Sequence, residues 1–204
     1  MNSTSAITLA ITGASGAIYS LRLLEQLVAA QRTVYLLISN PAKIVLETEL
    51  ELTLPAAALQ IQVLLTARYH AQPQQLQVFE LNQWTAPPAS GSAKVHAMVV
   101  CPCSGGTLSA IANGLSRSLI ERAAEVMLKE QRKLILVTRE TPLSVIHLEN
   151  MLRLARLGCV ILPASPGFYY RPQQIDQLVD FIVARILDQL DIPHNLLPRW
   201  GADE

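Results

Sequence analysis

The sequence predicts an α/β fold: a doubly wound, mainly parallel sheet with helices on both of its faces. Along most of the 204 residues, apolar runs of strand length alternate with segments that have the helical period. Near-continuous apolar runs are typical of parallel strands that are buried on both faces. Right-handed crossovers then place the helices on the two faces of one sheet. The length fits a single domain.

The first half of the chain predicts two strand–helix units and then a less regular stretch. Apolar, β-favouring residues make each strand, and leucines three and four apart give the first helix a buried face. Pro41 suits the first turn of the second helix, where a missing N–H costs nothing. In order, we expect a strand at 7–12, a helix at 18–30, a strand at 33–39, a helix from 41 to about 51, and short strands at 62–65 and 76–79.

The second half predicts three more strands, with amphipathic helices between and after them. Gly158 ends one helix, since glycine is common just beyond a helix C-terminus. In order, we expect a strand at 95–102, helices at 104–113 and 119–130, a strand at 133–138, a helix at 143–157, a strand at 159–163, a helix at 172–190 and a tail at 191–204.

Charge and hydropathy limit the classes of protein. Lys+Arg and Asp+Glu number 16 each, so no basic surface for nucleic acid or an anionic membrane is expected. Charged residues are 16% of the chain and hydrophobic residues 50%, whereas about 25% of a typical soluble domain is charged. A monomer of this composition would expose much apolar surface. We therefore infer that identical subunits bury it, with the tail at 191–204 packed on a neighbour.

Membrane spans, signal peptides and metal sites are not predicted. No apolar stretch is long enough for a bilayer, and the N-terminal M-N-S-T-S-A lacks a basic region followed by an apolar run. Three cysteines, Cys101, Cys103 and Cys159, form neither a disulfide framework nor a zinc spacing. The four histidines share no metal-ligand spacing. We expect reduced, buried thiols in a cytoplasmic protein without a metal.

The first strand runs into a turn, I-T-G-A-S-G, that is suited to a phosphate. A strand, a tight turn and a helix N-terminus expose backbone N–H groups at the positive end of a helix dipole. Gly13 and Ala14 allow close approach, and the Ser15 hydroxyl adds a donor. Because only Gly13 and Gly16 are present, the turn differs from the dinucleotide pattern G-x-G-x-x-G. A strand-to-helix turn without a ligand is the equal alternative.

Ligands of doubly wound sheets bind beyond the carboxyl ends of the strands. The residues that follow the strands are therefore expected to converge on one crevice. They supply hydroxyls and glycines, one Arg–Glu pair and an aromatic run. After successive strands come 13–15, then Ser39 and Asn40, then 103–107, then Arg139 and Glu140, and finally 164–170.

Several motifs have a functional and a structural interpretation. Ser104 is suited to cap a helix, which is compatible with ligand contact. The proline-rich loop 86–93 suits a flat cofactor ring or a plain surface loop. Arg122 and Lys129, two turns apart on one helix face, suit a phosphate or a solvated face. At a strand end, Glu140 is favoured as a general acid–base over an ion pair with Arg139.

Together and in order, these motifs resemble the UbiX-type flavin prenyltransferases, a family of flavodoxin-like, Rossmann-like three-layer flavoproteins. The resemblance runs from about residue 7 to residue 200. The segments that carry it are T-G-A-S-G (12–16), L-E-T-E (46–49), A-P-P-A-S-G-S (86–92), C-P-C-S-G-G-T-L-S (101–109), E-R-A-A-E-V-M-L-K-E (121–130), R-E-T-P (139–142), P-G-F-Y (166–169) and L-P-R-W (197–200).

The resemblance implies a metal-independent prenyltransferase. It would join the dimethylallyl group of dimethylallyl monophosphate to N5 and C6 of reduced FMN, with inorganic phosphate leaving. The prenylated FMN would go to a partner decarboxylase of the UbiD type, for ubiquinone biosynthesis or another decarboxylation. The family also implies a homododecamer. The sequence chemistry leaves open whether the donor is a mono- or a diphosphate.

The resemblance also implies roles for individual residues. The residues for FMN are Gly13, Ala14, Ser15, Ser39, Ser90, Gly91, Ser92, Ser104, Gly105, Gly106, Thr107 and Arg139. The residues for the prenyl donor are Trp84, Arg122, Lys129, Tyr169, Arg185 and Trp200. The catalytic residues are Ser15, Glu49, Arg122, Lys129, Glu140 and Tyr169.

Two other functions are compatible with such a fold. A flavin-dependent cysteine decarboxylase would use a histidine early in the chain and a P-x-M-N-x-x-M run, whereas the first histidine here is His70 and that run is absent. The chain could also be a non-catalytic flavin-binding subunit. Its retention of both proposed carboxylates, and of all the cationic side chains proposed to bind phosphate, argues against that interpretation.

Overall fold

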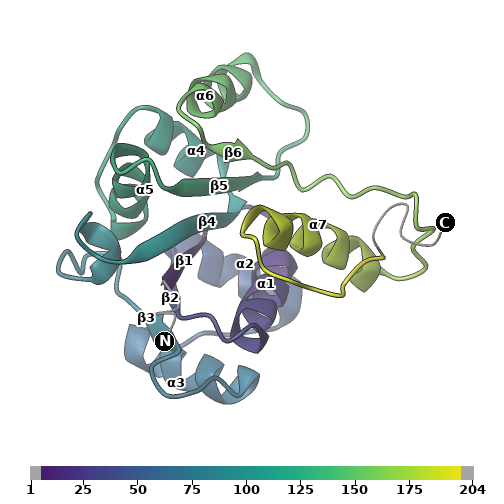
Figure 1. Ribbon diagram of the computed structural model, residues 1–204, viewed down its shortest axis with the longest axis horizontal. Coiled ribbons are helices and arrows are strands. Elements are labelled where there is room, and N and C mark those ends of the chain that lie inside the picture. Colours follow the sequence, from purple (N-terminus) through teal and green to yellow (C-terminus); the bar gives the residue numbers. More distant parts are fainter. Residues whose placement is uncertain (1–5, 199–204) are drawn as a thin grey trace.

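The computed structural model describes residues 6–198. Its sheet has six strands, all parallel, in the order β3-β2-β1-β4-β5-β6 (Figure 1). The doubly wound, parallel sheet that the sequence predicts is therefore confirmed. The strands are β1 (Ala6–Ile11), β2 (Val34–Ile38), β3 (Leu76–Val78), β4 (Val95–Cys103), β5 (Lys133–Thr138) and β6 (Val160–Ile161).

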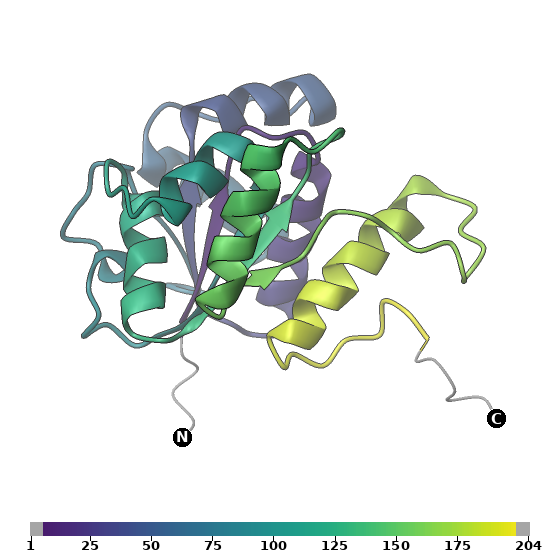
Figure 2. The same ribbon diagram turned by 90° about the horizontal axis from the view of Figure 1, so that it is seen from above.

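Helices cover both faces of the sheet, and each face has its own hydrophobic core (Figures 1 and 2). One core is closed by α1 (Ala17–Ala29), α2 (Asn40–Leu50), α3 (Ala58–Tyr69) and α7 (Ile175–Gln189). The other is closed by α4 (Gly105–Ala112), α5 (Leu119–Lys129) and α6 (Val145–Arg156).

The strands are apolar throughout because they face both cores. On β4, Val99 and Cys101 belong to one core, whereas Met98 and Val100 belong to the other. Successive side chains of a strand point to opposite faces. A strand between two helical layers therefore has no position for a solvated side chain, which is why the pattern is a run and not an alternation.

Two expectations about secondary structure need correction. Residues 62–65, expected as a short strand, lie inside α3, because Ala58, Ile61 and Leu65 are three and four residues apart and are all buried. The last helix begins at Ile175 and not at residue 172, with Gln174 and Gln177 forming its capping box. The short strand expected at 76–79 is confirmed as β3. The proline-rich loop contains one 3-10 turn, η1 (Pro87–Ala89).

Helix α6 leaves much apolar surface uncovered. Of its residues only Leu154 is buried, while the exposed ones include Val145, Ile146, Leu148 and Leu152. Exposed apolar faces of this extent are typical of contacts with another protein surface. Within residues 6–198, none of the helices combines the length and apolar character needed to cross a bilayer.

Candidate functional site

The candidate site lies at the carboxyl edge of the sheet, where the strand order reverses between β1 and β4. Ligands of open parallel sheets bind at such a switch point. Helices α1, α2, α4 and α6 each follow a strand and therefore begin at this edge (Figure 2). Their N-terminal N–H groups and dipoles favour an anion there.

Thr12 ties together the two turns that flank the switch point. Its hydroxyl donates to the carbonyl oxygen of Pro102 (2.7 Å) and accepts from the N–H of Ser104 (2.8 Å). Thr12 is 2% exposed, so these bonds are shielded from water. Sequence reasoning did not assign Thr12 to the site. The sequence did offer one sign of such a role, because Thr12 places a hydroxyl at the last position of the predicted apolar strand.

The first turn, residues 13–16, is shaped by two glycines. A Cβ at Gly13 would lie 2.5 Å from the Cβ of Pro41, so the start of α2 packs directly on this backbone. Gly16 has a φ of 104°, which is left-handed and favours glycine. Ala14 is buried and Ser15 is exposed. The turn thus presents the Ser15 side chain beside the N-terminus of α1.

The carboxylate of Glu49, on α2, lies at the same N-terminus. It accepts hydrogen bonds from the N–H groups of Gly16 (3.0 Å) and Ala17 (2.9 Å). These donors are among those that a helix leaves unpaired at its start. Glu49 therefore belongs to the site although it comes from another element, and an anionic ligand would compete with it for these donors.

Two serines at the same edge cap helices. Ser39 accepts from the N–H of Ala42 (3.2 Å) at the start of α2, and Ser104 accepts from the N–H of Thr107 (3.3 Å) at the start of α4. Next to Ser104, a Cβ at Gly105 would lie 2.8 Å from Nε2 of His147. At Gly106 no heavy atom lies within 4 Å of the position a Cβ would take. The start of α4 is therefore packed at Gly105 and open at Gly106.

Arg139 and Glu140 follow β5 at this edge. Their closest nitrogen and oxygen are 4.0 Å apart, and each side chain is 38% exposed. The Nε atom of Arg139 is buried and has no hydrogen-bond partner among the described residues. A nitrogen–oxygen distance of 4.0 Å is the longest that still counts as an ion pair, so the two side chains interact only weakly. Both are free to serve a ligand.

The proline-rich loop lies against α5, apart from the turns above. Arg122 donates to the carbonyl of Ala89 (3.0 Å), and a Cβ at Gly91 would lie 2.9 Å from Nζ of Lys129. The hydroxyls of Ser90 and Ser92 bond each other (2.8 Å). This loop leads into the start of β4, and Lys129 ends α5 just before the start of β5. Ser90, Gly91, Ser92 and Lys129 therefore lie toward the amino edge of the sheet.

Arg132 is a second residue that sequence reasoning missed. Its guanidinium donates to the carbonyls of Ala93 (2.8 Å) and Gly91 (2.6 Å), and so fixes the loop on the end of α5. The sequence offered one signal, a third cation three residues beyond Lys129. The expectation that Arg122 and Lys129 share a helix face agrees with their contacts to one loop.

The proposed donor residues near the C-terminus are spread along α7. Tyr169 is 79% exposed, in the loop before α7. Arg185 lies ten residues into the helix, about 15 Å along its axis. It bonds Asp188 (2.7 Å) and its side chain is 53% exposed. Arg185 therefore has an acidic partner on its own helix and is open to solvent. Trp84 is 49% exposed, and Trp200 lies outside the described residues.

One chain brings together some of the predicted residues and not others. The carboxyl edge gathers Gly13, Ala14, Ser15, Ser39, Glu49, Ser104, Gly105, Gly106, Thr107, Arg139 and Glu140. The loop on α5 and the residues around α7 form two further groups.

The thiols are unsuited to nucleophilic chemistry. Burial raises the pKa of Cys103 to about 12 and that of Cys159 to about 11, and it raises the pKa of Cys101 further. All three are free and buried, as expected, so they are protonated at neutral pH. Residues 6–198 also contain no cluster of three or more side chains that would hold a metal ion.

Comparison with known proteins extends the resemblance. Residues 1–187 match the model of a family described as Flavoprotein. A flavin prenyltransferase UbiX from Pseudomonas aeruginosa is 59% identical over 195 residues, which are 96% of this chain and 93% of the relative. A flavin prenyltransferase UbiX from Aquifex aeolicus is 47% identical over 95% of this chain and 97% of the relative.

Solved structures agree with these relatives. The crystal structure of AnUbiX (PadA1) in complex with FMN and dimethylallyl pyrophosphate superposes with a TM-score of 0.85, at 38% identity over 97% of each chain. A dodecameric, FMN-dependent UbiX-like decarboxylase from Escherichia coli O157:H7 has a TM-score of 0.83, also at 38% identity, over 97% of this chain and 100% of that one. A PPC decarboxylase at 14% identity (TM-score 0.60, 91% of this chain and 98% of that one) shares the fold alone.

Proposed function

The chain belongs to the Flavoprotein family and, within it, to the UbiX flavin prenyltransferases, and on this premise we propose how it acts. It joins the dimethylallyl group of dimethylallyl monophosphate to N5 and C6 of reduced FMN, and inorganic phosphate leaves. One observation carries the proposal: glycine- and serine-rich turns from β1, β2 and β4 lie at the same switch point of the sheet.

The residues at this edge fit FMN. The space beside Gly106 is open, and the buried Nε of Arg139 lacks a partner. FMN is held by Gly13, Ala14, Ser15, Ser39, Ser104, Gly105, Gly106, Thr107 and Arg139, with Ser90, Gly91 and Ser92 along its ring. Reduced FMN supplies the nucleophilic ring atoms that receive the prenyl group.

The remaining residues bind and activate the donor. Ser15, Arg122, Lys129, Tyr169 and Arg185 hold the phosphate and stabilise the charge that builds on it as the allylic C–O bond breaks. The aromatic faces of Trp84 and Trp200 shield the allylic carbons and stabilise cationic character there. Glu140 moves the proton that leaves the alkylated ring carbon, and Glu49 assists at the N-terminus of α1.

Neighbouring subunits complete the site. Ser15 and Glu140 lie at the carboxyl edge of the sheet, whereas Lys129 and the loop at residues 90–92 lie toward the amino edge. A ligand that touches both sets therefore sits between two chains. The uncovered apolar face of α6 supports a large homo-oligomer, and a UbiX-like structure is dodecameric. We propose a homododecamer in which the tail at 191–204 also contacts a neighbour, while Ile192 near its start is buried in the core of its own chain.

The product is consumed by a second enzyme. Prenylated FMN passes to a decarboxylase of the UbiD type, which serves ubiquinone biosynthesis or another aromatic acid decarboxylation in the cytoplasm. The family resemblance supports this assignment, and the balanced charge of the chain supports neither a nucleic acid nor a membrane as a partner.

A direct assay tests the function. The protein is incubated anaerobically with reduced FMN and dimethylallyl monophosphate, and the flavin is analysed by mass spectrometry. We expect the flavin to gain the mass of one prenyl unit, with release of phosphate. Release of CO₂ from a cysteine-containing substrate would instead indicate a decarboxylase, and no turnover of either substrate would indicate a binding subunit.

Mixed oligomers test the shared site. Ser15→Ala and Lys129→Ala chains are each expected to be inactive alone. Co-expressed at equal amounts, they are expected to recover about a quarter of wild-type activity, because half the Ser15 groups then meet an intact Lys129 half the time. The control mixes each variant with the Ser15→Ala, Lys129→Ala double variant, and neither mixture is expected to recover activity, because every chain in it then lacks the same one of the two residues. Absence of recovery in the first mixture would place Ser15 and Lys129 of one chain in the same site.

A further inference from the structure

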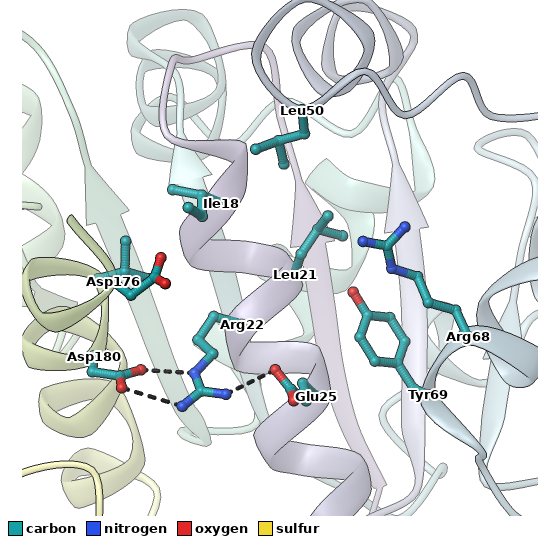
Figure 3. A pocket seen from close by; sticks show the side chains of 10 residues that line it. Ile18, Leu21, Arg22, Glu25, Leu50, Arg68, Tyr69, Asp176 and Asp180 are labelled. Atoms are coloured by element: carbon teal, nitrogen blue, oxygen red, sulfur yellow. Dashed lines mark hydrogen bonds and ion pairs between the residues drawn. The ribbon is translucent and has the colours of Figure 1, made fainter. Parts of the chain in front are cut away.

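One ion pair joins α1 to α7. The Nε atom of Arg22, on α1, donates to Oδ1 of Asp180 (2.7 Å), and its Nη2 donates to Oδ2 (3.2 Å), while its Nη1 donates to Glu25 (2.9 Å) (Figure 3). Two parallel bonds to one carboxylate fix the direction of the guanidinium as well as its distance. The pair therefore fixes one point at which the two helices meet.

The pair lies in a wall of the cavity drawn in Figure 3, which measures about 600 Å³. Arg22 and Asp180 are 30% and 20% exposed, respectively. The hydrogen bond with Asp180 raises the pKa of Arg22 above its usual value. A partly exposed pair of this kind contributes little to global stability. Removing the pair is therefore expected to leave the protein folded, so that an effect on the placement of α7 can be measured separately from an effect on stability.

Asp180 also faces the segment that carries Tyr169. We call residues 164–174 the donor strap. Gly167 of the strap rests on Phe181, since a Cβ there would lie 3.1 Å from the ring. Asp180, Phe181, Gly167 and Tyr170 line one cavity of about 250 Å³. The donor strap thus lies on the part of α7 that Arg22 holds.

The two helices carry different parts of the proposed site. Helix α1 begins at the first turn, with Ser15, whereas α7 follows the donor strap and carries Arg185. Helix α7 packs mainly on α1. Within residues 6–198, Arg22–Asp180 is the only ion pair between these helices.

We propose that Arg22 and Asp180 are a positioning pair that sets the place of the donor strap, and with it Tyr169, relative to the first turn. Neither side chain touches a reacting group. The pair acts through α7 on the affinity for the prenyl phosphate. This inference rests on the proposed function, because it takes the donor phosphate to be bound by Tyr169 and Arg185.

Steady-state kinetics of the FMN-loaded full chain test the pair. Asp180→Asn keeps the size of the side chain and removes its charge. We expect KM for dimethylallyl monophosphate to rise about tenfold, with kcat within about twofold and FMN affinity unchanged. The charge-swapped double variant Arg22→Asp, Asp180→Arg is expected to recover most of the lost affinity. An unchanged KM in Asp180→Asn, or an equal loss of FMN affinity, would overturn the proposal.

A matched control and a second readout separate the possible failures. Asp191→Asn breaks the pair with Lys133 (3.2 Å) near the other end of α7 and is expected to leave KM unchanged. Hydrogen exchange measures the mobility of the donor strap independently of catalysis. The backbone amides of residues 164–174 are expected to exchange several-fold faster in Asp180→Asn than in the wild-type protein. If the wild-type chain does not prenylate FMN, the proposed function is wrong. The positioning role is overturned separately, by equal exchange rates in the wild-type protein and Asp180→Asn.

Discussion

Glu140→Gln is expected to lower kcat for flavin prenylation by about 10²–10⁴-fold, the usual contribution of a general acid–base. The amide keeps the shape of the side chain but neither gains nor loses a proton near neutral pH, so it cannot act as a general acid or base. The carboxylate is 4.0 Å from Arg139, so its loss breaks no strong ion pair. FMN affinity and the thermal midpoint are therefore expected to stay near the wild-type values.

Single-turnover kinetics with preloaded reduced FMN measure this effect, since they exclude product release. Glu149→Gln is the matched control, because Glu149 is another exposed carboxylate, on α6, without a proposed role in the reaction. We expect the control to turn over at the wild-type rate. A Glu140→Gln enzyme with wild-type kcat would remove Glu140 from the chemistry and leave it a purely structural role.

Thr12→Val is expected to destabilise the protein by roughly 2–4 kcal/mol, because it leaves two backbone groups unpaired in a buried place. The isostere removes the hydroxyl that accepts from the N–H of Ser104 and donates to the carbonyl of Pro102. A loss of that size corresponds to a fall of about 5–15 °C in the thermal midpoint for a chain of this length. FMN affinity is expected to fall as well, since the turns on β1 and β4 are no longer joined.

Thr8→Val is a control on the same strand. Thr8 is 0% exposed, and its hydroxyl has no hydrogen-bond partner among the described residues. Removing that hydroxyl leaves no new unpaired group, so the thermal midpoint is expected to stay the same or to rise. Calorimetry and flavin fluorescence titration measure both variants. Equal midpoints for Thr12→Val and Thr8→Val would show that the link between the turns contributes nothing to stability.

Most of the fold was predictable, because a parallel sheet between two helical layers requires apolar strands. Six of the predicted strands, from residue 7 to residue 163, occur close to the expected positions. The error at residues 62–65 has a physical cause. Ile61, Val63 and Leu65 alternate like a strand, but Ile61 and Leu65 also share a helix face, and packing of that face on the core decided the outcome.

The candidate site was only partly predictable. The residues of the turns that follow strands could be predicted as site residues, because chain order places them at the carboxyl edge of the sheet. The contact of Glu49 with the N-terminus of α1 was not, since it joins residues 33 positions apart. The roles of Thr12 and Arg132 were missed for the same reason: a hydroxyl or a guanidinium shows no partner until the chain is folded.

The sequence by itself determined the layers, the strands that form the sheet and the turns that meet a ligand, because periodicity and turn chemistry are local properties of the chain. Only the tertiary structure decided which side chains meet. It placed Ser15 and Lys129 toward opposite edges of the sheet, left Arg139 and Glu140 barely paired, and joined Arg22 to Asp180 across 158 positions. Such pairings depend on how whole helices pack, and no local pattern specifies that.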